Sequence, residues 1–61
     1  MNRQRVAAIL CRRDGITFKE AEELIKQTIE EMEACNYAPC ECEDIMMANL
    51  GLEPDYIFDL I

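Results

Sequence analysis

The sequence predicts an all-α fold, a compact three-helix bundle with a short fourth helix at the C-terminus. Apolar side chains recur at helical spacing, and no stretch shows the alternation of a half-buried strand. Gly15 and Gly51 stand where helices are expected to end, and Pro39 and Pro54 where helices are expected to begin. A chain of 61 residues is long enough for one domain, so we expect residues 1–61 to form a single helical domain.

The first helix is predicted over residues 3–13. Arg12 and Arg13 fall in its last turn, where positive charge suits the negative end of the helix dipole. Gly15 follows as the expected C-terminal cap. Apolar residues at helical spacing form one side of this helix: Val6, Ile9 and Leu10.

The second helix is predicted over residues 18–35 and has the strongest local signal in the chain. Thr17 and Glu20 form a capping box, in which the Thr17 hydroxyl accepts from the Glu20 amide and the Glu20 carboxylate reaches back. Residues spaced for one apolar face follow: Phe18, Ala21, Leu24, Ile25, Thr28, Ile29, Met32 and Cys35. Charged residues occupy the other face, among them Glu22, Glu30 and Glu33.

A third helix is predicted over residues 39–50, with Pro39 in its first turn and Gly51 as its stop. Its apolar stripe consists of Cys42, Ile45, Met46 and Leu50. Asn49 falls near the centre of that stripe, so the helical phase is expected to differ there by a residue. The short fourth helix is predicted from residue 55, directly after Pro54.

Charge is distributed unevenly along the chain. Residues 1–13 hold four Arg and no acid, which gives +4, whereas residues 14–61 hold two Lys and thirteen acids, which gives −11 and a net charge of −7. This balance repels nucleic-acid phosphates and anionic membranes and favours basic partner surfaces. We therefore expect no direct nucleic-acid binding and no membrane contact, and we expect the arginines to neutralise the protein's own acidic helices.

The N-terminal region contains no segment typical of export. Its longest apolar run, Val6 to Cys11, is too short for a membrane span, and charged residues follow it at once where a signal peptide has a cleavage site. We therefore expect a cytoplasmic protein with reduced thiols.

The residue types that support catalysis are missing or unpaired. The chain has no His, the commonest acid–base residue at neutral pH, and no glycine-rich phosphate loop. The clustered carboxylates lack the glycine turn of a calcium loop and are explained by solvated helix faces. We expect the protein not to be an enzyme and to bind no cofactor.

The four cysteines leave three alternatives open. Cys35 and Cys42 fit the apolar faces of their helices, so we expect reduced, metal-free thiols with these two at least partly buried. A zinc site would use Cys11, Cys35, Cys40 and Cys42, but their spacing is not the paired pattern of zinc knuckles. A disulfide is the third alternative.

The C-terminal tail carries five apolar residues among its last six: Tyr56, Ile57, Phe58, Leu60 and Ile61. One face of a short helix cannot bury them all, and we expect Ile57 with Leu60 or Ile61 to close the core. The alternative is that all five fold back onto the first two helices. Exposed aromatics surrounded by acids are typical of a surface for a partner or for self-association. Tyr56 and Phe58 are therefore candidate partner-binding residues.

The stretch from Asp44 to Leu60 resembles the end of small uncharacterised proteins encoded by phages, prophages and other mobile elements. The group closes with an L-G-L-E-x-D-Y-[IL] signature, which residues 50–57 match, after a helix with an E-A-E-x-[LI] pattern like residues 20–24. The resemblance implies a cytosolic accessory protein of a mobile element. It transfers no catalytic or binding residues.

These observations together favour a non-enzymatic, acidic protein-interaction module. Its partner would be a basic or apolar protein surface, met either by Glu22, Glu30 and Glu33 or by the Tyr56 and Phe58 tail. A module of this kind encoded by a mobile element would target a host protein, in one version by presenting carboxylates as a mimic of nucleic acid. The alternatives are a structural homo-oligomer, such as a homodimer, formed through the tail and a Cys-ligated metal module.

Overall fold

The long helix α2 (Phe18–Ala34) is the element against which most of the other helices pack. The computed structural model describes residues 2–60, and among them it contains helices and no strand. The remaining elements are α1 (Arg3–Asp14), α3 (Pro39–Ile45), η1 (Met46–Leu50), which continues α3 directly, and η2 (Pro54–Asp59). The predicted all-α class is confirmed.

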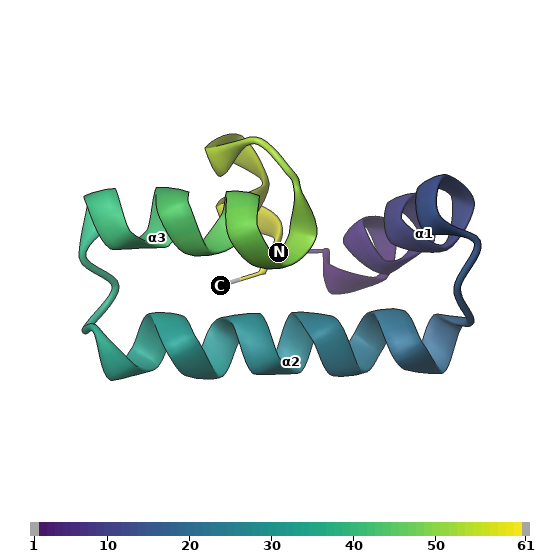
Figure 1. Cartoon of the computed structure of the whole chain (residues 1–61), viewed down its shortest axis with the longest axis horizontal. Coiled ribbons are helices and arrows are strands. Elements are labelled where there is room, and N and C mark those ends of the chain that lie inside the picture. The colour runs from purple at the N-terminus through teal and green to yellow at the C-terminus, as the bar shows by residue number, and fades with distance from the viewer. Residues whose placement is uncertain (1, 61) are drawn as a thin grey trace.

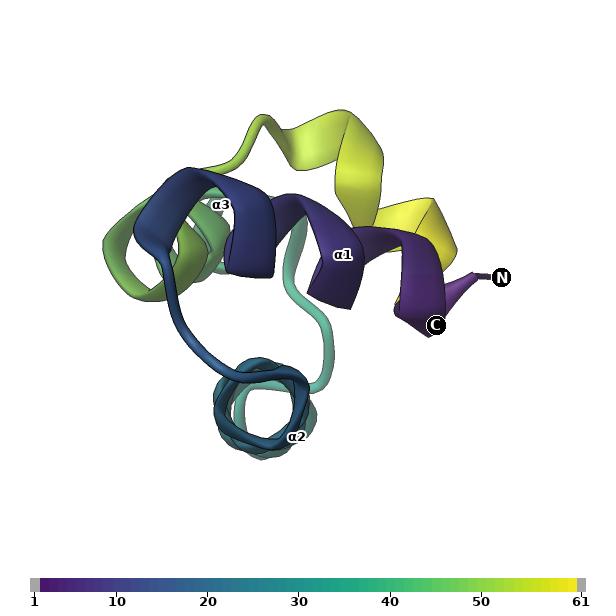
Figure 2. The same ribbon diagram turned by 90° about the vertical axis from the view of Figure 1, so that its right-hand side faces the viewer.

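The helices are arranged in layers around α2. In Figure 1 the α3–η1 segment runs back along α2, while α1 lies over the other end of α2. Seen along the axis of α2 in Figure 2, α1 crosses over α2, and the C-terminal segment lies beside the N-terminal part of α1. The backbone amide of Asn2 donates to the carbonyl of Asp59 at 2.9 Å, so the two ends of the described chain meet.

One core lies where these layers meet, and every helical element except η2 contributes a buried residue to it. Thr28 is the one buried polar residue described, and its hydroxyl donates to the carbonyl of Leu24 at 2.7 Å. The apolar core consists of Val6, Ala7, Leu10, Ala21, Ile25, Ile29, Met32, Cys42, Met46, Leu50, Leu52 and Leu60. These residues include most of the apolar positions predicted for the first three helices, because helical spacing fixes which side chains share a face.

Both ends of α2 have a defined chemical cause. At its start, the Thr17 hydroxyl accepts from the Glu20 amide at 3.1 Å, and the Glu20 carboxylate accepts from the Thr17 amide at 3.1 Å, so the predicted capping box is confirmed. At its end, Asn36 and Tyr37 both take left-handed backbone angles, with φ of 54° and 56°. The Tyr37 amide then donates to the Met32 carbonyl at 2.9 Å and reverses the chain toward α3.

The prediction of one regular α-helix over residues 39–50 is wrong in its second half. The α-helical part ends at Ile45, and Met46–Leu50 form a π-helix closed by Gly51 at φ 64°. A π turn bonds five residues back instead of four, and therefore inserts an extra residue into the helical phase. This shift leaves Leu50 buried and moves Asn49 to the edge of the core, where its side-chain amide donates to the Glu31 carboxylate of α2.

Two further expectations are corrected by the structure. Phe18 was expected on the buried face of α2 but is 44% exposed, because it is the first residue of the helix and borders an open groove. The fourth helix begins one residue earlier than predicted, at Pro54, and is a 3₁₀ helix rather than an α-helix. Its six residues exceed the usual run of about three or four residues for this tighter winding.

Replacing Thr17 by Ala is expected to lower the free energy of unfolding by about 1 kcal/mol at neutral pH, because the Glu20 amide loses its acceptor. The pKa of Glu20 is lowered because the Thr17 amide and then the Thr17 hydroxyl donate to its carboxylate. A carboxyl group whose pKa is lower in the folded state stabilises the protein at pH values above its unfolded-state pKa, which is about 4.3 for Glu. This stabilisation is lost as the pH falls through the folded-state pKa.

The difference in the free energy of unfolding between the wild type and Thr17→Ala is therefore expected to become smaller from pH 7 to about pH 3, as measured by urea denaturation. Thr17→Ser, which keeps the hydroxyl, is the matched control and should unfold close to the wild type. An unchanged midpoint for Thr17→Ala at pH 7 would show that the cap does not contribute.

Candidate functional site

The three candidate carboxylates of α2 are all exposed. Glu30 and Glu33 lie eight and eleven residues after Glu22, which places the three side chains on one side of the helix. At 1.5 Å per residue the row spans roughly 16 Å. Burial, followed by the nearby Glu33 carboxylate, raises the pKa of Tyr37. The three acids therefore lie along one exposed side of α2, with Glu22 at the edge that faces α1.

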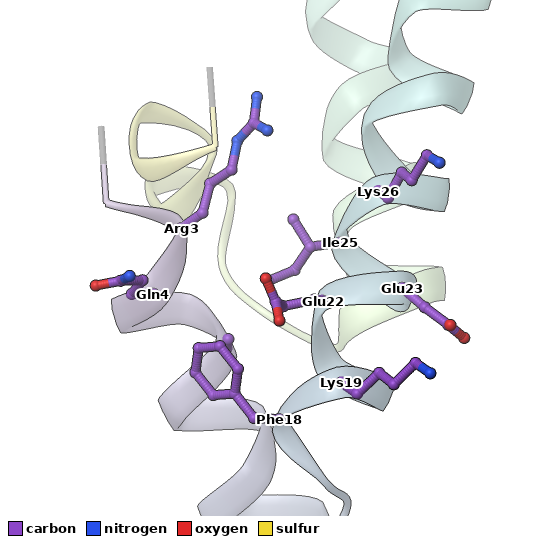
Figure 3. A pocket seen from close by; sticks show the side chains of 9 residues that line it. Arg3, Gln4, Phe18, Lys19, Glu22, Glu23, Ile25 and Lys26 are labelled. Atoms are coloured by element: carbon purple, nitrogen blue, oxygen red, sulfur yellow. The ribbon is translucent and has the colours of Figure 1, made fainter.

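A groove of about 410 Å³ opens between α1 and the first half of α2. Figure 3 shows the Glu22 carboxylate pointing toward α1 and the Phe18 ring lying between the two helices, while Lys19 and Glu23 extend from the other side of α2. Three basic and two acidic residues contribute to the lining, so the groove does not select a ligand by charge. We assign no ligand to it.

The tail residues have different environments. Leu60 is fully buried and closes the core, whereas Ile57 is only partly buried, and Ile61 lies outside the described residues. Phe58 is 72% exposed, more than any other large hydrophobic residue described. Of the two aromatic candidates, Phe58 is therefore presented to solvent, and Tyr56 is half-buried.

Residues of the N-terminal segment hold this tail in place. The Arg3 Nε donates to the Leu60 carbonyl at 3.0 Å. The Arg5 guanidinium lies 5.9 Å from the centre of the Tyr56 ring and 3.9 Å from the Asp59 carboxylate. These contacts hold η2 from both sides of Phe58. They also show that two of the four N-terminal arginines contact the tail, a long-range role that the sequence did not indicate.

Arg13 has the most extensive polar contacts of any side chain described. Its Nη2 donates to the Leu50 carbonyl at 2.6 Å and its Nη1 to the Gly51 carbonyl at 3.1 Å, two oxygens at the end of η1. The Asp14 carboxylate accepts from Arg13 at 2.8 and 2.9 Å, and this pairing lowers the pKa of Asp14. The sequence placed Arg13 only at the end of its own helix. Its partners lie 37 and 38 residues away, and no local pattern could identify them.

The four cysteines differ in burial, and a prediction had been made for two of them. Cys42 is buried and Cys35 partly buried, which confirms the expectation for these two, while Cys11 is partly buried and Cys40 exposed. All four are free thiols in the structure. Among residues 2–60, no group of three or more Cys, Asp or Glu side chains is arranged to hold a metal ion, so the fold does not assemble the four-cysteine ligand set.

Comparisons with known proteins identify no relative. No family model matches the chain, and neither the curated proteins nor the solved structures contain a significant match. In the part of the chain that the structure describes, no helix combines the length and the apolar character needed to cross a membrane.

Replacing Arg13 by Ala is expected to lower the melting temperature by several degrees, because the end of η1 and the end of α1 lose their shared donor. Arg12→Ala is the matched control, since Arg12 is the exposed neighbour with the same charge and has no hydrogen bond described. Arg13→Lys should lie between the two, because Lys keeps the charge but lacks the planar fork. Equal melting temperatures for Arg13→Ala and Arg12→Ala would contradict this role.

Proposed function

We propose that the protein is a non-enzymatic protein-interaction module that presents Phe58 to an apolar pocket with a basic rim on a partner protein. The observation that supports this proposal is the combination of exposure and anchoring in one short segment. Phe58 is 72% exposed, and the residues beside it are held by Arg5 and by the burial of Leu60.

A fixed aromatic side chain is an efficient binding group. Aromatic anchors that fill a pocket provide a large share of the binding energy of many interfaces. Association also has an entropic cost for ordering loops and side chains, and that cost is smaller where the segment is already ordered. The hydrogen bond from the Leu60 amide to the Ile57 carbonyl at 2.9 Å and the one from Arg3 to the Leu60 carbonyl supply this order.

The charge around Phe58 supports a basic partner. Glu53 and Asp55 are exposed on the same segment, and the whole chain carries a net charge of −7. Complementary charge at the rim of an interface mainly accelerates encounter and suppresses wrong partners, whereas the aromatic contact sets the lifetime of the complex. The row of Glu22, Glu30 and Glu33 adds to the attraction and is the surface that a mimic of nucleic acid would use.

The biological setting is part of the same proposal. The sequence resemblance of residues 44–60 supports an accessory protein of a mobile element that acts in the cytoplasm on a host protein. The exposure of Phe58 favours a second candidate function, a homodimer formed through the tails of two copies. Sedimentation of the purified chain separates the two, because a doubled mass at micromolar concentration would favour the homodimer.

Replacing Phe58 by Ala is expected to weaken partner binding by about 30-fold, which corresponds to about 2 kcal/mol for the loss of a central aromatic anchor. The partner is first captured from the native host with the wild-type chain and identified by mass spectrometry, and the affinity is then measured with purified proteins. Phe18→Ala is the matched control, since Phe18 is the other phenylalanine and is also exposed. Equal affinity for Phe58→Ala and the wild type would refute the role of the tail.

Reversing Glu22, Glu30 and Glu33 together to Lys is expected to slow association more than it accelerates dissociation, because exposed rim charges act on encounter. The association rate of the wild type should also fall steeply as the Debye length is reduced from about 10 Å to about 3 Å by salt. Reversal of Glu41, Glu43 and Asp44, also exposed, is the control with the same change in net charge. An identical fall in the association rate of both triple variants would show that only net charge matters and that the carboxylates of α2 have no special role.

A further inference from the structure

The groove between α1 and α2 has an apolar floor and an aromatic side wall. Ala7 and Ile25, which are almost fully buried, contribute to the floor. The Phe18 ring lies between the two helices and is 44% exposed (Figure 3). A cavity of roughly 150 Å³ is enough to hold a benzene ring. The groove, at about 410 Å³, therefore has room for an aromatic side chain beside Phe18.

Phe58 is an aromatic side chain suited to such a groove. It is 72% exposed, and it is not among the residues that line the groove of its own copy. Arg3 lines the groove and also donates to the Leu60 carbonyl at 3.0 Å, so the groove and the tail are neighbours. Figure 2 agrees, since the C-terminal segment lies beside the N-terminal part of α1. An exposed aromatic side chain and an apolar groove are therefore close together on one molecule.

The distribution of charge favours a second copy of this chain as the occupant. With thirteen acids and six basic residues per chain, two copies repel each other over most of their surfaces. The groove differs, because three basic and only two acidic residues line it, and both lysines of the chain, Lys19 and Lys26, are among them. A nearly neutral lining does not choose among ligands in general, but it is a surface that another acidic copy can approach. The tail would bring its exposed acids, Glu53 and Asp55, toward these lysines.

We propose that the groove receives the Phe58 side chain of a second copy, and that two copies exchange this contact in a symmetric dimer. Around a two-fold axis each contact is made twice, from the tail of one copy to the groove of the other and the reverse. Because tail and groove are neighbours, one axis can serve both contacts. This inference rests on the homodimer named above as the second candidate function, and it replaces a contact between two tails by a contact between tail and groove.

Such a dimer would compete with the partner complex, because both use Phe58. A partner with an apolar pocket would bind the monomer, and its apparent affinity would fall in proportion to the fraction of chains that are monomeric. Self-association would therefore cover the exposed aromatic side chain until a partner is present.

Sedimentation equilibrium of the full chain, kept reduced so that the exposed Cys40 cannot link two copies, tests the dimer. The mass of the wild type is expected to double reversibly between micromolar and millimolar concentration. Phe58→Ala and Phe18→Ala should each raise the dimer dissociation constant by about 30-fold or more, because each removes an aromatic ring from both contacts. Tyr37→Ala is the matched control, since Tyr37 is 40% exposed and lies beyond the other end of α2.

An equimolar mixture of the two phenylalanine variants tests the exchange itself. Phe58→Ala keeps an intact groove and Phe18→Ala keeps an intact tail, so a mixed dimer retains one of the two contacts, whereas neither variant alone retains any. The dissociation constant of the mixed dimer should lie between that of the wild type and those of the single variants. If Phe18→Ala unfolds, Lys26→Glu changes an exposed residue of the same groove and should also weaken the dimer.

The failure of this inference can be told apart from the failure of the proposed function. A wild type that stays monomeric at millimolar concentration would overturn the dimer, while binding to the captured partner is measured separately. Dimerisation of Phe18→Ala as strong as that of the wild type would show that tail meets tail, so the homodimer would stand and the groove contact would be wrong. A mixture no more dimeric than its two components, or a mass larger than that of a dimer, would contradict the symmetric exchange.

Discussion

The burial of one face of α2 is the constraint on which the rest of the structure depends. A chain of 61 residues can bury only a small core, and five residues of α2 are buried in it. α1 crosses over this face, α3 and η1 run back along it, and Leu60 of the tail closes it. Because the core has so few members, the positions of α1, α3 and η1 depend on how each reaches α2, and η2 in turn packs against these three elements.

Polar contacts from α1 then fix the parts that the small core cannot. Arg13 joins the end of α1 to the end of η1, while Arg3 and Arg5 hold the tail. Sequence reasoning expected these arginines to neutralise acidic helices, and the Arg5 contact with Asp59 agrees with that. The stronger interactions, however, are with backbone carbonyls at helix ends, which are short of donors wherever a helix stops. The basic N-terminal segment is therefore accounted for mainly by internal contacts.

The sequence could predict what local rules determine and could not predict what distant segments determine. The capping box at Thr17, the stop at Gly51 and the apolar spacing of α2 all depend on neighbours within four residues. The cap and the stop were found as expected, and so was the apolar face of α2 apart from Phe18 at its first turn. The π-helix was visible only as a conflict, since Asn49 fell on the apolar stripe. The resolution of that conflict required Glu31 of α2 as a partner for Asn49. For the candidate site, the number of apolar residues in the tail predicted that some of them would be exposed. Which aromatic side chain is exposed, Phe58 rather than Tyr56, depended on the position of Arg5, more than fifty residues earlier.

Backbone ¹⁵N relaxation of the uniformly labelled chain tests most directly whether the tail is an ordered surface that presents Phe58. If η2 is fixed by Leu60, Arg3 and Arg5, the order parameters of residues 55–60 should equal those of α2, at about 0.85. Values below about 0.6 across the same residues would show a flexible tail and would contradict the account.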